Sequence, residues 1–131
     1  NTLAQEGLTP KRLGRTAMRL ARAGAALEHM TTSFLNETLV QRGMESPVWE
    51  LNYACFMDQP EEIRLRCLSR AIEALGPSRD YPPRLEKLES LLMRVEDSGS
   101  FTGATLGGCC FHLAYDDTNH LCLRMICETG S

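Results

Sequence analysis

The chain has 131 residues, enough for one domain or for two small subdomains that share a core. A hydrophobic share of 43% can form a packed interior, and no apolar run is long enough to span a membrane. The net charge of −3 argues against a stand-alone nucleic-acid binder, which is usually strongly basic, but it leaves room for a local basic face.

A long amphipathic helix is predicted near the start of the chain, from about Pro10 to Leu39. Thr9 can cap this helix, and proline suits its first turn. Apolar or small residues then recur at alternating steps of four and three, which places them on one face. This apolar stripe consists of Leu13, Ala17, Leu20, Gly24, Leu27, Thr31 and Phe34. Gly24 and the alanines around it would let another element approach closely.

The segment from about 48 to 96 is predicted to form a strand and then two helices. Residues Val48 to Met57 alternate with period two, as in a half-buried strand. Pro60 and the acidic residues after it start the second helix, which Gly76-Pro77 ends. Pro82-Pro83 leads into a third helix, which closes at Asp97 to Ser100.

A C-terminal hairpin is predicted at about 105–128. Thr105 to Tyr115 forms one strand, Asp116 to Asn119 the turn, and His120 to Glu128 the return strand. The expected fold is therefore α+β, with three helices packed with a small three-stranded antiparallel sheet that includes this hairpin. The whole chain, 1–131, is expected to be a single accessory, substrate-binding domain.

The six cysteines are predicted to be buried, reduced thiols that act as small hydrophobes: Cys55, Cys67, Cys109, Cys110, Cys122 and Cys127. No C-x-x-C spacing is present, and adjacent residues such as Cys109 and Cys110 point to opposite faces of a strand. No metal ligands are therefore expected.

Signatures of catalysis are missing. The sequence has no phosphate loop, no G-x-S-x-G elbow and no H-E-x-x-H pair. Gly107-Gly108 is interpreted as a bulge or a tight backbone contact rather than a phosphate cradle. Cys110 and His112 would share one strand face, which leaves a small cysteine enzyme as an alternative, but no third group that would orient them is evident. Catalytic, cofactor-binding and metal-binding residues are therefore predicted to be absent.

The main functional signal is a set of basic residues on the first helix. Arg12, Arg15, Arg19 and Arg22 step by three, four and three, so they form one stripe at about 140° from the apolar stripe. Lys11 lies at its edge. Aligned guanidinium groups suit phosphate contacts, whereas a solvated helix face is the alternative interpretation. A second, looser basic set lies around the third helix and comprises Arg79, Arg84, Lys87 and Arg94.

Three stretches carry a resemblance to a known family. "LAQEGLTPKRLGRTAMRLARAGAAL", "LSRAIEALGPSRDYPPRLEKLESLL" and "GATLGGCCFH" resemble the region that follows the catalytic domain in bacterial tRNA(Ile)-lysidine synthetases, the MesJ cell-cycle proteins. The likeness extends from Leu3 to about Glu128, and the stretches come in the family's order. Arg12 to Arg22 corresponds to the family's helix just after the catalytic domain, and Pro82-Pro83-Arg84 to its Pro-Pro-Arg entry into the next helix.

The resemblance implies a parent enzyme of the PP-loop group, a ligase that uses ATP with magnesium. That enzyme adenylates a cytidine in the anticodon of tRNA(Ile), and lysine then displaces AMP to give lysidine. The S-G-G-x-D-S loop that binds ATP belongs to the family's N-terminal domain and is not in this chain. No catalytic or cofactor residue is therefore carried over; only the role in positioning the tRNA is.

We therefore expect a tRNA-positioning domain with nucleic-acid contacts at eight residues: Lys11, Arg12, Arg15, Arg19, Arg22, Arg79, Arg84 and Lys87. The implied partners are tRNA(Ile) and the N-terminal catalytic domain of the same protein, in the cytoplasm and without a membrane. The start of the chain lacks both a signal peptide and an initiator Met. We therefore expect the chain to be a piece of a longer protein. The alternative is a structural module that packs on that catalytic domain or forms a homodimer, with no RNA contact.

Overall fold

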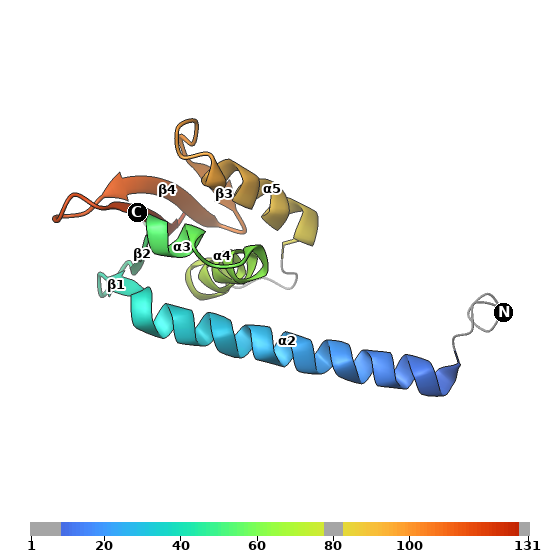
Figure 1. The fold of residues 1–131 in the computed structure, drawn as a ribbon. Coiled ribbons are helices and arrows are strands. Elements are labelled where there is room, and N and C mark those ends of the chain that lie inside the picture. The colour runs from blue at the N-terminus through green and yellow to red at the C-terminus, as the bar shows by residue number, and fades with distance from the viewer. Residues whose placement is uncertain (1–8, 78–82, 129–131) are drawn as a thin grey trace.

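The computed structural model describes residues 9–77 and 83–128. Its helices are α2 (Pro10–Thr38), α3 (Tyr53–Met57), α4 (Glu61–Leu75) and α5 (Leu85–Glu96). Its strands are β1 (Val40–Arg42), β2 (Val48–Asn52), β3 (Ala104–Leu106), β4 (Cys109–Tyr115) and β5 (Leu121–Cys127). The five strands form one antiparallel sheet in the order β1-β2-β5-β4-β3 (Figure 1).

The prediction of three helices with a three-stranded sheet is wrong, although the fold is α+β. The described chain has four helices and five strands. Strands β1 and β3 have three residues each, too few for alternation to be recognised. The segment predicted as one strand at 48–57 divides at Asn52, whose side chain accepts a hydrogen bond from the Cys55 N–H and caps the short helix α3.

The strand predicted at Thr105–Tyr115 is in fact a hairpin of β3 and β4. Gly107 and Gly108 form the turn, with φ angles of +61° and +78°, in the left-handed region that glycine adopts without strain. A Cβ atom on Gly107 would lie 2.5 Å from Cγ2 of Ile72 in α4. The glycine pair is therefore a tight turn against α4, in agreement with the structural interpretation of the sequence.

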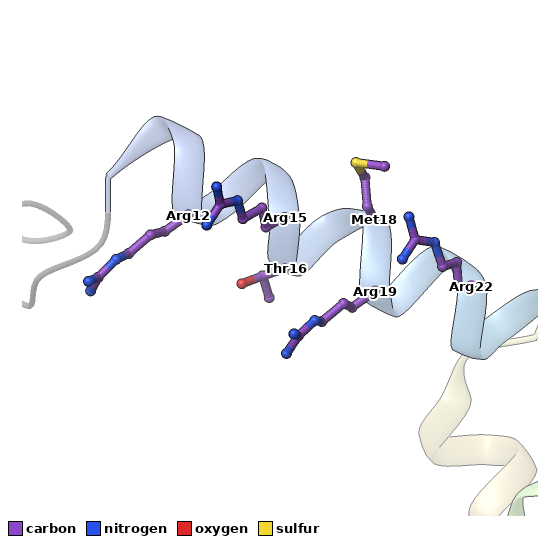
Figure 2. A pocket seen from close by; sticks show the side chains of 6 residues that line it. All are labelled: Arg12, Arg15, Thr16, Met18, Arg19 and Arg22. Carbon is purple, nitrogen blue, oxygen red and sulfur yellow. The ribbon is translucent and has the colours of Figure 1, made fainter.

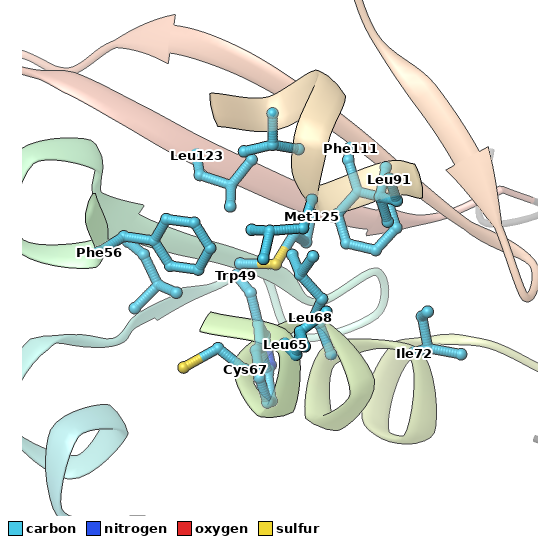
Figure 3. Packing of buried hydrophobic residues seen from close by; sticks show 14 of the residues in the cluster. Trp49, Phe56, Leu65, Cys67, Leu68, Ile72, Leu91, Phe111, Leu123 and Met125 are labelled. Carbon is cyan, nitrogen blue, oxygen red and sulfur yellow. The ribbon is translucent and has the colours of Figure 1, made fainter. Parts of the chain in front are cut away.

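One face of the sheet carries the hydrophobic core. Four of its buried side chains are seen in Figure 3: Trp49, Phe111, Leu123 and Met125. Leu51 lies opposite Leu123 on the same face and is also buried. The helices that contact the sheet all add buried residues to the same cluster, including Phe56 of α3, Leu68 of α4 and Leu91 of α5. In the described part of the chain, the opposite face of the sheet therefore carries no helical layer.

Helix α2 packs on the body of the protein only near its C-terminal end. Thr31, Phe34 and Leu35 are buried, and α2 contacts α4. Every residue at 10–23 is exposed, and Figure 1 shows this part of α2 projecting away from the other elements. The Thr9 hydroxyl accepts a hydrogen bond from the Arg12 N–H at 3.2 Å and caps the projecting end. We call residues 10–23 the outward segment of α2.

Candidate nucleic-acid interface

The structure brings the four arginines of the predicted stripe together on the outward segment. Arg12, Arg15, Arg19 and Arg22 line a shallow surface hollow with Thr16 and Met18 (Figure 2). Arg12 and Arg19 extend in one direction from the helix, as residues seven apart on a helix do, and Arg15 and Arg22 form a neighbouring row. The four guanidinium groups are therefore presented together and in solvent.

The charge of this surface has little internal compensation. Residues 10–27 contain five basic side chains and no carboxylate, whereas the whole chain has 14 basic and 17 acidic residues. Arg15, Arg19 and Arg22 form no ion pair with another described residue. In contrast, five arginines of the body are paired with carboxylates: Arg42, Arg64, Arg66, Arg70 and Arg124. The positive field of the outward segment is therefore directed at solvent.

The second predicted basic set does not join this surface. Arg84 and Lys87 are exposed at the start of α5, and neither lines the hollow on α2. Arg79 lies outside the described residues. The groove between α2, α4 and the start of α5 is lined by carboxylates as well as by arginines: Glu28, Glu62 and Glu73 with Arg66 and Arg70. The acidic side chains separate the two basic regions.

A polar network that the sequence did not reveal fixes α2 on α4. The Arg70 Nη2 atom donates to Glu28 Oε2 at 2.6 Å and to the Thr32 hydroxyl at 2.8 Å. Arg66 Nη1 donates to the other oxygen, Glu28 Oε1, at 2.9 Å. The hydrogen bond from Arg70 lowers the pKa of Glu28, so the carboxylate is held charged. The contacts join residues about 40 positions apart, so no local pattern predicts them.

The cysteines do not assemble into a catalytic or metal site. None of the six forms a disulfide. The prediction that all are buried is confirmed for Cys67, Cys109 and Cys122 and is wrong for the other three, since Cys55 is exposed and Cys110 and Cys127 are half-buried. Burial raises the pKa of Cys67 and Cys109 to about 12. Within residues 9–77 and 83–128, no three His, Cys, Asp or Glu side chains gather as metal ligands.

Cys110 and His112 both lie on the outer face of the sheet, the face opposite the hydrophobic core, as their spacing predicts. Burial, and then the Glu128 carboxylate, raises the pKa of Cys110, whereas a cysteine nucleophile needs a lowered one. Burial, and then Arg124, lowers the pKa of His112. His112 lies opposite Arg124 in the sheet, and no described carboxylate orients it toward the thiol. The geometry therefore gives no support to the cysteine-enzyme alternative.

No helix among the described residues combines the length and apolar character needed to cross a membrane. The described residues thus form an α+β domain with an exposed basic helix face. At the Gly107-Gly108 turn, Ile72 and Pro83 occupy the space beside Gly107.

Sequence comparisons place this domain in a family. The chain is 36% identical over 116 residues to a tRNA(Ile)-lysidine synthase of Methylobacterium nodulans, covering 86% of this chain and 34% of that protein. It is 37% identical over 100 residues to the tRNA(Ile)-lysidine synthase of Bradyrhizobium diazoefficiens, covering 73% of this chain and 27% of that protein. No protein-family model matches the chain, and no solved structure matches it significantly.

The chain belongs to the tRNA(Ile)-lysidine synthase family. It spans about a third of the length of the curated relatives that it matches most extensively.

Proposed function

We propose that this domain positions tRNA(Ile) for a ligase that attaches lysine to an anticodon cytidine, and that the outward segment of α2 contacts the phosphates of that tRNA. The observation that carries the proposal is the arginine stripe: four exposed arginines on one helix face, in a segment with no carboxylate. The names of the relatives, tRNA(Ile)-lysidine synthases, supply the kind of partner.

The stripe is suited to phosphates rather than to bases. Each guanidinium offers a planar fork of donors that matches two phosphate oxygens. From Arg12 to Arg22 the helix rises about 15 Å, so the stripe can follow several phosphates of one strand. Such contacts set the position of a nucleic acid without reading its sequence. The role we propose is therefore to hold the tRNA in register, while recognition of the anticodon belongs to other parts of the protein.

The opposite face of the outward segment has features that call for a protein partner. Leu13 and Leu20 are 38% and 69% exposed, on the continuation of the stripe that packs on α4 at Thr31 and Phe34. A glycine within a helix costs about 1 kcal/mol relative to alanine. A Cβ atom on Gly24, the glycine of this stripe, would meet no described atom within 4 Å beyond the neighbouring turns of α2, so no described contact requires a glycine there.

We infer that this apolar face packs against the remaining part of the same protein, where Gly24 permits close approach. The relatives are about three times as long as the matching region, so a further domain is available to cover it. Since the two stripes are about 140° apart, the helix can pack on that domain and present its arginines to tRNA at the same time. One face of α2 would then have the structural role, and the other face would contact the tRNA.

Charge reversal in the intact ligase tests the proposal. Arg15→Glu with Arg19→Glu should weaken tRNA binding and flatten the plot of log K against log salt concentration by about 1.5. The matched control, Arg15→Lys with Arg19→Lys, keeps the charge and should retain most of the slope. Because neither arginine has a described ion-pair partner, thermal stability should not change. A tRNA affinity and salt slope equal to those of the unmodified ligase would refute the stripe's role.

A further inference from the structure

A row of polar side chains crosses the outer face of the sheet, on the side away from the core. Glu50 of β2 lies opposite Arg124 of β5, and Arg124 lies opposite His112 of β4. Arg42 of β1 joins the row by forming an ion pair with Glu50. The four side chains, with Val48 and Ile126, line one open depression on this face.

Glu50 is buried although no helix covers it. Its exposed fraction is 4%, and it is the only carboxylate among the buried residues of the described chain. One carboxylate oxygen, Oε2, accepts a hydrogen bond from Arg124 Nε at 2.6 Å, and the other, Oε1, is paired with Arg42 Nε. A buried carboxylate is tolerated when both of its oxygens are compensated in this way. The two arginines are thereby fixed on either side of one anchor.

The way the arginines bind Glu50 leaves their outer edges available. Each uses its Nε atom, and the terminal nitrogens of Arg42 and Arg124 donate no hydrogen bond to another described residue. Their side chains are 56% and 35% exposed. Two cations around one anion leave a surplus of one positive charge. The ion pairs with Glu50 already order both arginine side chains. A ligand that binds at their outer edges therefore loses little additional side-chain entropy.

We propose that Arg42, Arg124 and His112 form a second phosphate site, which binds the backbone of the same tRNA. The proposal rests on the proposed function for its choice of ligand. The depression is open and is lined only by strand residues, so a free phosphate would gain few contacts there. A phosphodiester of an RNA already held by α2 binds at a high effective concentration and needs little affinity of its own. Glu50 is a positioning residue in this site.

The test uses the intact ligase and a variant in which the three charged side chains are replaced by neutral ones. Removing the arginines alone would leave Glu50 buried without partners, so Arg42→Gln, Glu50→Gln and Arg124→Gln are combined. The triple variant should bind tRNA about tenfold more weakly and lose about 0.9 of the salt slope, as for one lost phosphate contact. The matched control, Glu73→Gln, changes an exposed carboxylate of α4 that lies outside this depression and should leave tRNA affinity unchanged. The unmodified affinity and slope in the triple variant would overturn the site.

Two further comparisons separate the possible outcomes. The first adds inorganic phosphate at matched ionic strength and measures the melting temperature of the unmodified ligase and of the triple variant. If phosphate stabilises only the unmodified ligase, and the triple variant binds tRNA as tightly as the unmodified ligase does, the site binds a small anion and the RNA assignment is overturned. The charge reversal at Arg15 and Arg19 is measured in parallel. If the charge reversal weakens tRNA binding and the triple variant does not, the sheet site is refuted and the α2 contact stands. If the triple variant weakens tRNA binding and the charge reversal does not, the α2 contact is refuted and the sheet site stands.

Discussion

Arg70 of α4 donates two hydrogen bonds to one carboxylate oxygen of Glu28 in α2, from Nη2 at 2.6 Å and from Nε at 3.1 Å. These bonds lie where α2 leaves the body of the protein, five positions after Ala23, the last residue of its outward segment. They therefore fix the direction in which the arginine stripe projects.

Replacing Arg70 should affect tRNA binding without any change in the stripe. In Arg70→Met the apolar stem is kept but the bonds to Glu28 and Thr32 are lost, so α2 is held less firmly on α4. We expect weaker tRNA binding in the intact ligase and a loss of less than about 1 kcal/mol in the free energy of unfolding, because the pair is partly exposed. Fluorescence anisotropy and urea unfolding measure the two effects.

Glu73→Gln on the same helix, at an exposed carboxylate without a described ion pair, is the control for Arg70→Met. Unchanged tRNA affinity in Arg70→Met would mean that the direction of α2 is set elsewhere.

Gly24→Ala should have opposite effects in this chain and in the intact ligase. In the 131-residue chain, no described atom beyond the neighbouring turns of α2 lies within 4 Å of the new Cβ, and the alanine should stabilise the helix by about 0.5–1 kcal/mol. In the intact protein the same Cβ would meet the domain that we propose to pack there, and the melting temperature should fall. Equal stabilisation of both forms would show that nothing approaches this face closely.

Asp116 should make stability depend on pH in the acid range. The backbone N–H of His120, followed by the Thr118 hydroxyl, holds the pKa of this carboxyl at about 2, below its ordinary value of 3.8. The pKa of Asp116 is lower in the folded state than in the unfolded state. Its contribution to the free energy of unfolding is therefore present above pH 3.8 and is lost as the pH falls toward 2. Unfolding of Asp116→Ala, followed by circular dichroism, should show a smaller loss of stability in this interval. An identical pH dependence in the variant would rule the residue out.

The thiols should differ sharply in reactivity. Cys55 is exposed, whereas Cys67 and Cys109 are buried with pKa values of about 12. With a disulfide reagent near pH 8, Cys55 should react first, and Cys67 and Cys109 only after unfolding. Cys55→Ser should remove the fastest phase. A fast thiol at Cys110 in that variant would reopen the cysteine-enzyme alternative.

Part of this fold could be predicted because its signals are local. The α2 helix has a capping Thr9 and a long 3.6-residue periodicity, and the same periodicity places its arginines on one face. Strands β1 and β3 are too short to show alternation, and the cap at Asn52 ends a pattern that otherwise continues into α3.

Part of the candidate sites could not be predicted. The pairing of Arg42 and Arg124 with Glu50, and that of Arg70 with Glu28, depend on contacts between distant positions. Charge spacing along the chain gives an arginine's place on a helix but not its partner. Sequence therefore indicated the solvent-facing stripe on α2, but not the anchored arginines of the outer sheet face.

The central claim, that one face of α2 meets tRNA and the other meets protein, is tested most directly by site-specific photo-cross-linking in the intact ligase. A benzophenone amino acid is placed at Arg19 or, on the opposite face, at Leu20. We expect the Arg19 position to cross-link to tRNA(Ile) and the Leu20 position to cross-link within the protein. Cross-linking of tRNA from Leu20, or from neither position, would contradict the account.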